Sequence, residues 1–417
     1  MGLEMDAEER GYLDDPYQIE FEARVREVEP LGEDRFAVYL DRTFFYPVSG
    51  GQPDDRGTLG GKQVIEVTET ERGVCHVVEG ELKPGAEVEG TIDWNRRFDH
   101  MQQHSGQHLL SRVILNELGL PTVGFHLGDT TCTIDLGGDI PSFEKVDLIE
   151  SLVNGLIWKD ITNADRTVAK DEYERMTEEE QKATGSGIRS RLPEDVERVR
   201  IVEITDLDRS TCCGTHTRST GEIGAIKILG TERMKGNARV AFICGERALR
   251  DYSEKHTLLN TLAGHFSTDW TELDRLVERL IEENKDLKKR ADELQRELAG
   301  HRASELDMPT SSVGGFDIVR RVFEDTDVPS LRETVFKIRE EGGKIVLFGI
   351  TGPKPGLIFS CSQDVSLDMG ELMKRCAPII GARGGGGKDF AQGGGGDAAR
   401  LDETLDEAER VIREALE

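Results

Sequence analysis

Residues 104–108 read HSGQH, and this short stretch decides how the middle of the chain is interpreted. It lies inside DHMQQHSGQHLLSRVILNELG, residues 99–119, whose pattern and closing Gly119 predict a helix. Positions four apart on a helix project from the same face, so the rings of His104 and His108 are expected to lie side by side. Two imidazoles at this spacing can share one tetrahedral zinc ion.

A second half-site follows about a hundred residues later. Residues 209–219 read RSTCCGTHTRS, so one of two adjacent cysteines and His216, with a flexible Gly214 between them, can complete a zinc set. Helical histidines are more often solvated and a buried cysteine is often only a small hydrophobe. The occurrence of both patterns in one predicted domain favours a metal site. His100, one helical turn before His104, is expected to support a ligand or to have no role, rather than to be a ligand.

The sequence argues against two other enzyme classes. A zinc protease of the helix-borne type needs glutamate directly after its first histidine as the general base. Ser105 holds that position here. A phosphoesterase of the Asp-His-His type is disfavoured because the chain contains no Asp-His-His triplet.

The composition is strongly acidic. The chain has 417 residues, a formal net charge of −28, 36% hydrophobic and 32% charged residues, and its length predicts about two to four domains. Such acidity argues against non-specific binding of nucleic acid, which depends on Lys and Arg. However, acidic residues are spread along the whole chain and arginine outnumbers lysine, as expected of a halophilic protein in concentrated salt. The charge therefore does not exclude an RNA substrate.

The sequence shows no targeting or membrane-spanning segment and no disulfide pattern. The N-terminal stretch MGLEMDAEERGYLDDP is acidic and lacks an apolar segment, and no apolar run approaches the length of a membrane span. The seven cysteines show no framework spacing, which indicates reduced thiols. We therefore expect a cytoplasmic protein without a membrane partner.

The periodicities predict a multidomain α+β fold. Phe21, Ala23 and Val25 alternate with charged residues like a half-buried strand, whereas FDIVRRVF, KIVLFGIT and LIFSCS near the C-terminus predict strands between helices. The predicted regions are a small β-barrel (16–96), an α+β zinc-binding domain with an antiparallel sheet (97–250), a helical linker (251–308) and an α/β C-terminal domain (309–417).

The helical linker has a heptad pattern over residues 268–299. Every seventh residue from Leu273 to Leu294 is leucine, and the other heptad position contains Asn284, a polar residue of the kind that sets register. This pattern predicts a coiled coil or a helical hairpin, with a long helix packed on its own chain as the alternative. We expect a homodimer through this coiled coil or through the C-terminal domain.

Four motifs, in this order, resemble a known family. HSGQHLL (104–110) and CCGTHTRSTGEIG (212–224) are similar to the editing domain of alanyl-tRNA synthetases and of their free-standing relatives, the AlaX proteins. FYPVSGGQPDDRG (45–57) resembles the glycine-rich motif of the preceding β-barrel, and GGGGKDFAQGGGG (384–396) resembles the signature of the synthetase C-terminal domain. The resemblance covers roughly residues 16–417, leaves no room upstream for an aminoacylation domain, and implies the long AlaX type, with a halophilic archaeon as the expected source.

The resemblance implies a deacylase that edits mischarged tRNA(Ala) in trans, removing serine or glycine. A second hydrolytic site is needed because a pocket for alanine gains only about 1–3 kcal/mol against a substrate that differs by one methyl group. No side-chain base is assigned, and the expected nucleophile is a water that zinc either ionises or only helps to orient. The alternative is a zinc-containing RNA-binding module without activity.

The family motifs also imply site residues. Because the family has its ligand cysteine four residues before the histidine, they imply one Zn²⁺ held by His104, His108, Cys212 and His216. Cys213 stands where the family usually has glycine, and metal binding by Cys213 is the alternative. Gly50, Gly51 and Gln52 are expected to line the substrate pocket, with an ordinary hairpin turn as the alternative. Phe125 and His126 of GFHLG, and Thr215, are also expected to bind the substrate.

The C-terminal glycine-rich stretch is not expected to bind ATP. A phosphate-binding P-loop requires glycine where Ala382 stands, and Ser or Thr where Asp389 follows Lys388. We expect a backbone nest that contacts RNA phosphate, with a flexible loop as the alternative. The implied tRNA-binding residues are Arg383, Gly385, Gly386, Lys388 and Gln392.

Overall fold

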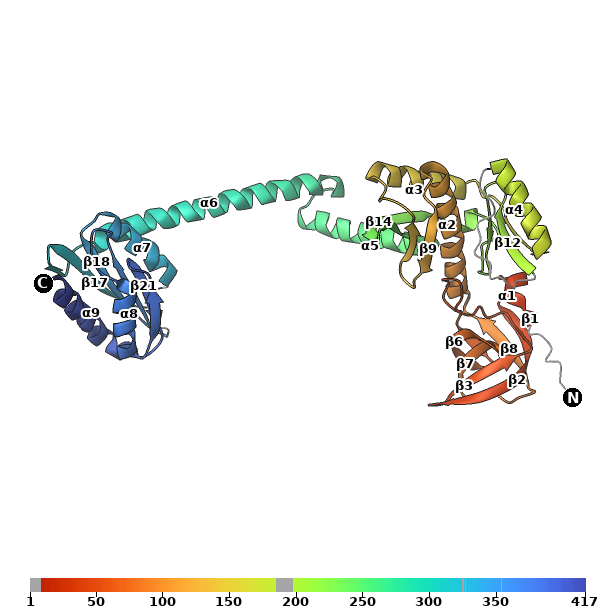
Figure 1. The fold of residues 1–417 in the computed structure, drawn as a ribbon, viewed down its shortest axis with the longest axis horizontal. Coiled ribbons are helices and arrows are strands. Elements are labelled where there is room, and N and C mark those ends of the chain that lie inside the picture. The colour runs from red at the N-terminus through yellow and green to blue at the C-terminus, as the bar shows by residue number, and fades with distance from the viewer. Residues whose placement is uncertain (1–8, 185–197, 325, 327, 354) are drawn as a thin grey trace. The chain divides into compact units, whose positions relative to one another are not determined.

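The computed structural model describes residues 9–184, 198–324, 326, 328–353 and 355–417. The chain divides into two compact units, Met1–Leu262 and Ala263–Glu417, which are described separately below (Figure 1). None of the helices described combines the length and the apolar character needed to span a bilayer.

Six antiparallel strands form a sheet in the N-terminal unit, after the short strand β1 (Glu9–Arg10) and the short helix α1 (Gly11–Asp14). They pair in the order β2-β3-β7-β6-β5-β8, and β8 pairs again with β2, so the sheet closes into a barrel (Figure 1). The alternating residues Phe21, Ala23 and Val25 of β2 are buried in its interior because side chains of a strand point alternately to its two faces. The strands are β2 (Glu20–Gly32), β3 (Arg35–Leu40), β5 (Gly57–Leu59), β6 (Lys62–Thr70), β7 (Gly73–Glu79) and β8 (Glu87–Ile92).

Helix α2 (Trp94–Leu118) follows the barrel directly. The Asp93 side chain accepts a hydrogen bond from the Arg96 backbone N–H at its start, and Gly119 ends it in the left-handed region, at φ 67°, as the sequence predicts. Every residue from His100 to Ile114 is buried, so this helix has no solvent face in its middle. It is therefore a rigid support for the two histidines of HSGQH.

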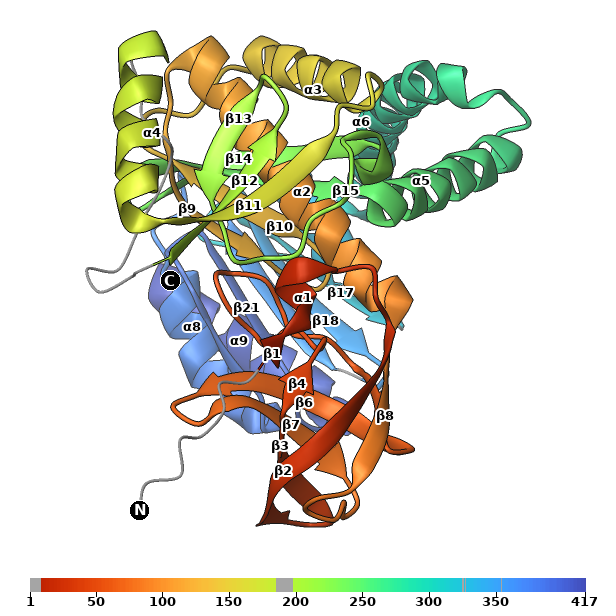
Figure 2. The same ribbon diagram turned by 90° about the vertical axis from the view of Figure 1, so that its right-hand side faces the viewer.

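Two antiparallel sheets follow in the N-terminal unit, where the sequence predicted a single antiparallel sheet. One sheet has the order β14-β15-β10-β9 and packs with α2 and α3, and the other has the order β11-β12-β13 and is covered by α4 (Figure 2). The elements are β9 (Thr122–Leu127), β10 (Cys132–Leu136), α3 (Phe143–Ile157), β11 (Asn163–Ala169), α4 (Lys170–Thr184), β12 (Arg198–Ile204), β13 (Asp208–Thr211), β14 (Ile226–Met234) and β15 (Asn237–Cys244).

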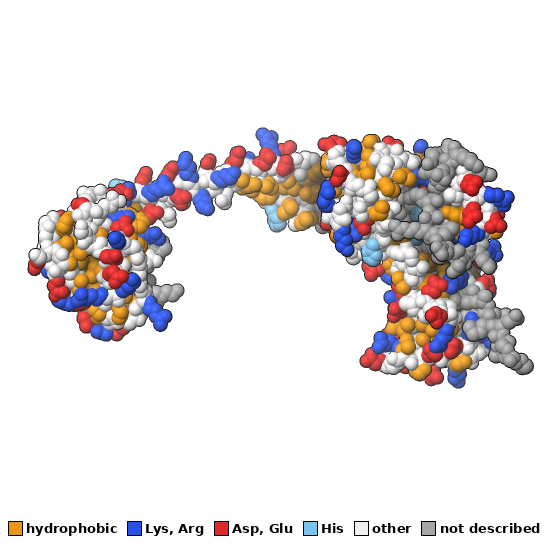
Figure 3. All heavy atoms as spheres, in the orientation of Figure 1, with side chains coloured by type: hydrophobic (Ala, Val, Ile, Leu, Met, Phe, Trp, Pro, Cys, Tyr) orange, Lys and Arg blue, Asp and Glu red, His pale blue; other side chains and the backbone are white. Residues whose placement is uncertain are grey.

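The heptad region is helical. Helix α5 (Gly245–His265) is followed by the long helix α6 (Leu273–Leu306), along which acidic and basic side chains intermingle (Figure 3). Leu273 is buried, whereas Leu280, Leu287 and Leu294 are exposed by 42%, 63% and 64%. The coiled coil and the hairpin therefore stay predictions, since a single chain leaves these leucines uncovered.

The C-terminal unit contains a six-stranded mixed sheet in the order β16-β17-β18-β19-β21-β20. The three predicted strands are present as β17, β18 and β19. Strands β17 and β18 pair in parallel and are joined by α7, whereas the other described neighbours in this sheet pair antiparallel. Helices α8 and α9 pack on a core on one face of this sheet. The elements are β16 (Ser311–Val313), β17 (Phe316–Glu324), α7 (Val328–Glu340), β18 (Lys344–Thr351), β19 (Gly356–Cys361), α8 (Met369–Cys376), β20 (Arg383–Gly386), β21 (Phe390–Gly394) and α9 (Leu401–Leu416).

The glycine-rich stretch of this unit forms a β-hairpin, β20–β21, rather than a loop. Its glycines permit close packing: a Cβ on Gly386 would lie 2.2 Å from the Phe390 carbonyl oxygen, and one on Gly384 would lie 2.7 Å from the Gly393 Cα. No non-glycine side chain fits at such distances. The hairpin pairs through β21 with β19 and so belongs to the main sheet.

Candidate metal centre

Three histidines and one cysteine converge beside α2. The ligand atoms of His104, His108, Cys212 and His216 all lie within 4.8 Å of one another. Helix α2 supplies the first two, whose rings stack with centroids 5.1 Å apart, and the loop after β13 supplies the other two. The Cys212 Sγ lies 3.3 Å from His104 Nε2 and 3.4 Å from His216 Nε2.

The loop that carries Cys212 is shaped by contacts to its backbone. The Arg200 guanidinium of β12 donates hydrogen bonds to the carbonyl oxygens of Cys212 and Gly214, at 3.2 and 2.8 Å. A Cβ on Gly214 would lie 2.1 Å from Cε1 of His104. Gly214 is therefore required for the close approach of the loop to α2, a different role from the flexibility expected of it.

Each histidine of the group has a polar partner at its Nδ1. Gln52 Oε1 lies 2.7 Å from Nδ1 of His104. Ser210 Oγ lies 2.9 Å from Nδ1 of His108, and Ser105 Oγ lies 3.4 Å from Nδ1 of His216. These contacts direct the opposite ring nitrogens, which could hold a metal ion, toward the centre of the group.

Electrostatics keep the imidazoles of His104 and His216 neutral. Burial lowers the pKa of His104 and of His216 well below the ordinary value, and the neighbouring histidines and Arg200 lower it further. Neutral imidazole is the form of histidine that binds a metal ion. Three imidazoles and one thiol are a donor set typical of zinc, so the residues present fit the ion that the motifs imply.

Two residues whose roles were left open are outside this group. Cys213 is exposed, whereas the half-buried Cys212 belongs to the group. His100 is buried and its Nδ1 has no hydrogen-bond partner in the described part of the chain. Burial and the charges of nearby arginines lower the pKa of His100 to about 3, so it is neutral at physiological pH.

The sequence analysis missed several polar residues that lie beside the candidate ligands. Asp208 accepts a hydrogen bond from Arg112 at 2.7 Å, and its Oδ2 lies 4.0 Å from Nδ1 of His108. One signal was available for Arg112, since it follows His108 by four residues and so shares its helix face. For Arg200, no motif in the sequence indicated a bond to the loop of Cys212.

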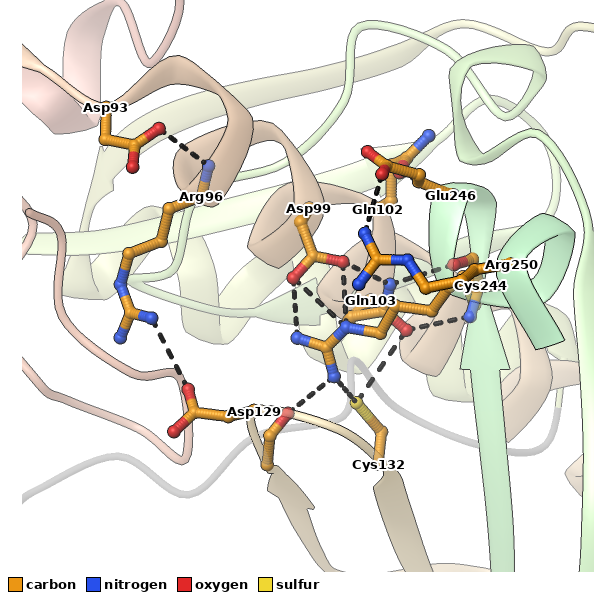
Figure 4. Close-up of polar contacts among 12 residues, drawn as sticks. Asp93, Arg96, Asp99, Gln102, Gln103, Asp129, Cys132, Cys244, Glu246 and Arg250 are labelled. Carbon is orange, nitrogen blue, oxygen red and sulfur yellow. Dashed lines mark hydrogen bonds and ion pairs between the residues drawn. The ribbon is translucent and has the colours of Figure 1, made fainter. Parts of the chain in front are cut away.

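Helix α2 is anchored on a second side by a polar network (Figure 4). The Gln103 side chain accepts a hydrogen bond from the Cys244 backbone N–H at 2.8 Å and donates one to the Cys244 carbonyl oxygen at 3.0 Å. Asp99 accepts hydrogen bonds from the Arg247 guanidinium at 2.6 to 3.1 Å. These bonds join α2 to the end of β15 and the start of α5, so the helix that carries His104 is held on both sides.

The expected substrate-binding residues fall into two classes. Gly50, Gly51, Phe125 and His126 are exposed, and the Phe125 ring lies 5.8 Å from that of His104. Gly51 has φ 83°, which favours glycine, and its carbonyl oxygen accepts a hydrogen bond from the Leu127 backbone N–H at 3.0 Å.

Gln52 and Thr215 form the other class. Both side chains are 0% exposed, and Gln52 Nε2 donates a hydrogen bond to Thr215 Oγ1 at 2.9 Å.

The expected tRNA-binding residues lie on the β20–β21 hairpin of the C-terminal unit. Arg383, Lys388 and Gln392 are exposed. Gly385 pairs with Gln392, and Gly386 pairs with Ala391. The hairpin therefore presents two cationic side chains to solvent.

Comparisons with known proteins match three separate parts of the chain. The family described as threonyl and alanyl tRNA synthetase second additional domain matches residues 199–241, the DHHA1 domain matches residues 317–414, and the class II (A) tRNA synthetases match residues 17–96.

Whole-chain relatives fall into two groups. The alanyl-tRNA editing protein AlaX-L of Pyrococcus horikoshii is 30% identical over 98% of this chain and 99% of its own, and the alanyl-tRNA editing protein Aarsd1 of Rattus norvegicus is 32% identical over 86% and 84%. The alanine–tRNA ligase of Pyrococcus abyssi is 32% identical over 96% of this chain, which spans only 43% of the ligase.

Proposed function

Since this chain belongs to the family of alanyl-tRNA editing proteins, we propose that it hydrolyses the ester that joins serine or glycine to mischarged tRNA(Ala). The observation that carries this proposal is the group of His104, His108, Cys212 and His216. A repair activity is needed because alanine differs from glycine by one methyl group and from serine by one hydroxyl group, and binding alone discriminates weakly against such small changes.

The proposed cofactor is one Zn²⁺ per chain, held by these four residues. Bound zinc would supply positive charge that polarises a water or orients the ester, and four protein ligands favour the orienting role because they fill a tetrahedral site. Phe125 and His126, with Gly50 and Gly51, would border the substrate, where the absence of a glycine side chain permits close backbone approach.

The C-terminal unit is proposed to bind the body of the tRNA. Arg383 and Lys388 are exposed on the β20–β21 hairpin, and exposed cations beside glycine backbone suit contacts to phosphate. Gly385, Gly386 and Gln392 of the same hairpin would add backbone and amide contacts.

A homodimer is proposed through α6. Leu280, Leu287 and Leu294 are exposed at seven-residue spacing, and a second copy of α6 would cover them. The proposed compartment is the cytoplasm, where mischarged tRNA is available and the thiol of Cys212 stays reduced.

The test is deacylation by the purified protein in concentrated salt, with zinc content measured on the same sample. Ser-tRNA(Ala) and Gly-tRNA(Ala) are the substrates, and Ala-tRNA(Ala) is the control. We expect Cys212→Ser to lose zinc and deacylation together, and the matched variant Cys213→Ser to keep both. Normal hydrolysis by a zinc-free Cys212→Ser protein would refute the proposal, and zinc binding without hydrolysis by the parent would indicate an RNA-binding module instead.

A further inference from the structure

The side chain of Gln52 connects the barrel to the metal centre. Its backbone forms a tight pair of hydrogen bonds with Ser49, N to O at 2.9 Å and O to N at 3.2 Å, so the start of the side chain is fixed within the barrel loop. Its amide is 0% exposed and contacts His104 of α2 and Thr215 of the metal loop. One side chain thus contacts a ligand on α2 and the loop that carries the other two candidate ligands.

The contacts determine which end of the amide is oxygen. The Thr215 backbone N–H points at one end of the Gln52 amide, at 3.2 Å, and a backbone N–H can only donate. That end must therefore be Oε1, and the other end is Nε2, which donates to Thr215 Oγ1 at 2.9 Å. The reverse orientation would set two donors against each other in a buried place.

The tautomer of His104 follows from this orientation. Oε1 of Gln52 lies 2.7 Å from Nδ1 of His104, and an amide oxygen only accepts, so the proton of the neutral ring is on Nδ1. The lone pair is then on Nε2, which lies 3.3 Å from the Cys212 Sγ. The Ser105 and Ser210 hydroxyls beside the other two histidines can donate or accept, so neither dictates a tautomer.

We propose that Gln52 is a positioning residue of the metal centre, which holds His104 in its metal-binding tautomer and couples docking of the barrel to metal binding. This inference rests on the proposed metal centre. The glycine-rich motif of the barrel then has two roles. The exposed Gly50 and Gly51 would border the substrate, whereas the buried Gln52 amide supports His104 and the loop of Thr215.

The experiment compares two variants of nearly equal size in the full-length protein. Gln52→Glu keeps an oxygen that accepts from His104 and from the Thr215 N–H, and Thr215 Oγ1 can reorient its proton toward the carboxylate. Gln52→Met keeps the volume but removes both polar ends. Zn²⁺ affinity is measured by chelator competition, and the Co²⁺ form is examined by its visible spectrum, which reports the geometry of thiolate and imidazole ligands.

We expect Gln52→Met to weaken Zn²⁺ binding about 10- to 100-fold and to change the Co²⁺ spectrum, while Gln52→Glu stays within a few-fold of the parent. The control is Thr43→Val, which removes the buried barrel hydrogen bond to His76 without touching a ligand, and should leave metal affinity unchanged. Parental affinity in Gln52→Met, or equal losses in the Met and Glu variants, would overturn the proposal.

A second measurement does not require a variant to fold. Nitrogen-15 spectra of histidine-labelled, metal-free parent protein should show His104 protonated at Nδ1, and a proton at Nε2 would contradict the inference. The two proposals can fail separately. Zinc content and deacylation of the parent protein test the proposed function. The ratio of the Zn²⁺ affinities of Gln52→Glu and Gln52→Met tests the role of Gln52.

Discussion

The two glycine-rich stretches of this chain, residues 49–57 and 383–396, both combine glycine with charged residues and glutamine, but their surroundings differ. In the first, the polar side chains of Gln52, Asp54 and Asp55 are buried and hydrogen-bonded. In the second, Arg383 and Lys388 are exposed. Glycine provides tight packing in both, so the role of each stretch follows from the polar residues between the glycines.

This difference predicts separate consequences of mutation. The first stretch connects the barrel to α2 and to the candidate metal ligands, so its changes should affect stability and the proposed metal binding. The second stretch presents cations on a hairpin, so its changes should affect tRNA affinity and leave folding intact.

The largest expected effect is on the buried ion pair of the first stretch. Asp55 pairs with Arg97 with both side chains 0% exposed, and Arg97 also donates to the Pro16 and Phe44 carbonyl oxygens. Asp55→Asn leaves a buried guanidinium uncompensated and should cost about 3–5 kcal/mol of unfolding free energy. In the second stretch, Asp389→Asn breaks a half-exposed pair with Arg339 and should cost less than about 1 kcal/mol. Denaturant titration measures the unfolding free energy of both variants. Equal losses would show that the two stretches do not differ in their contribution to stability.

A pH titration of the metal-free protein should show the next effect. Burial lowers the pKa of His76 to about 4 and that of His100 to about 3, whereas both titrate near 6.5 when unfolded. Below pH 6.5 the unfolded state therefore binds protons that the folded state does not, and stability falls by about 1.4 kcal/mol per pH unit for each histidine.

Both histidines belong to the N-terminal unit, so between pH 6.5 and 5 we expect that unit to lose stability before the C-terminal one. The transitions can be followed by hydrogen exchange of each unit. His76→Gln provides the control, because it removes one titrating group and should flatten the slope. Stability of the N-terminal unit that does not change across this range would contradict the prediction.

The smallest expected effect is on tRNA affinity. Replacement of Arg383 and Lys388 by alanine should weaken tRNA binding a few-fold and lower the slope of log affinity against log salt by about 1 for each phosphate contact removed. The control is Arg410→Ala, because Arg410 is engaged with Glu407 and Glu414 on α9. Filter binding over a series of salt concentrations measures the effect. An unchanged slope in the double variant would show that Arg383 and Lys388 do not contact tRNA phosphates.

Local patterns predicted much of this molecule. The spacing of His104 and His108 placed both rings on one face, because a helix has about 3.6 residues per turn and positions four apart nearly coincide around its axis. The helix end at Gly119 was predicted because glycine readily adopts the left-handed conformation of a helix cap. The burial in β2 and the three strands of the C-terminal sheet were predicted from strand patterns, in which side chains alternate between two faces. The glycine-rich segment near residue 385 was not expected to be paired, because glycine has no side-chain period that indicates a strand.

The sequence by itself determined the ligand types of the candidate metal centre and the elements that carry them, since each half-site lies within a few residues of chain. The tertiary structure alone decided what surrounds those ligands. Gln52 meets His104 across 52 residues and Ser210 meets His108 across 102, and such contacts depend on how a barrel, a helix and a sheet pack together. No local pattern encodes them, because hydrogen-bond partners in a folded chain are selected by proximity in space.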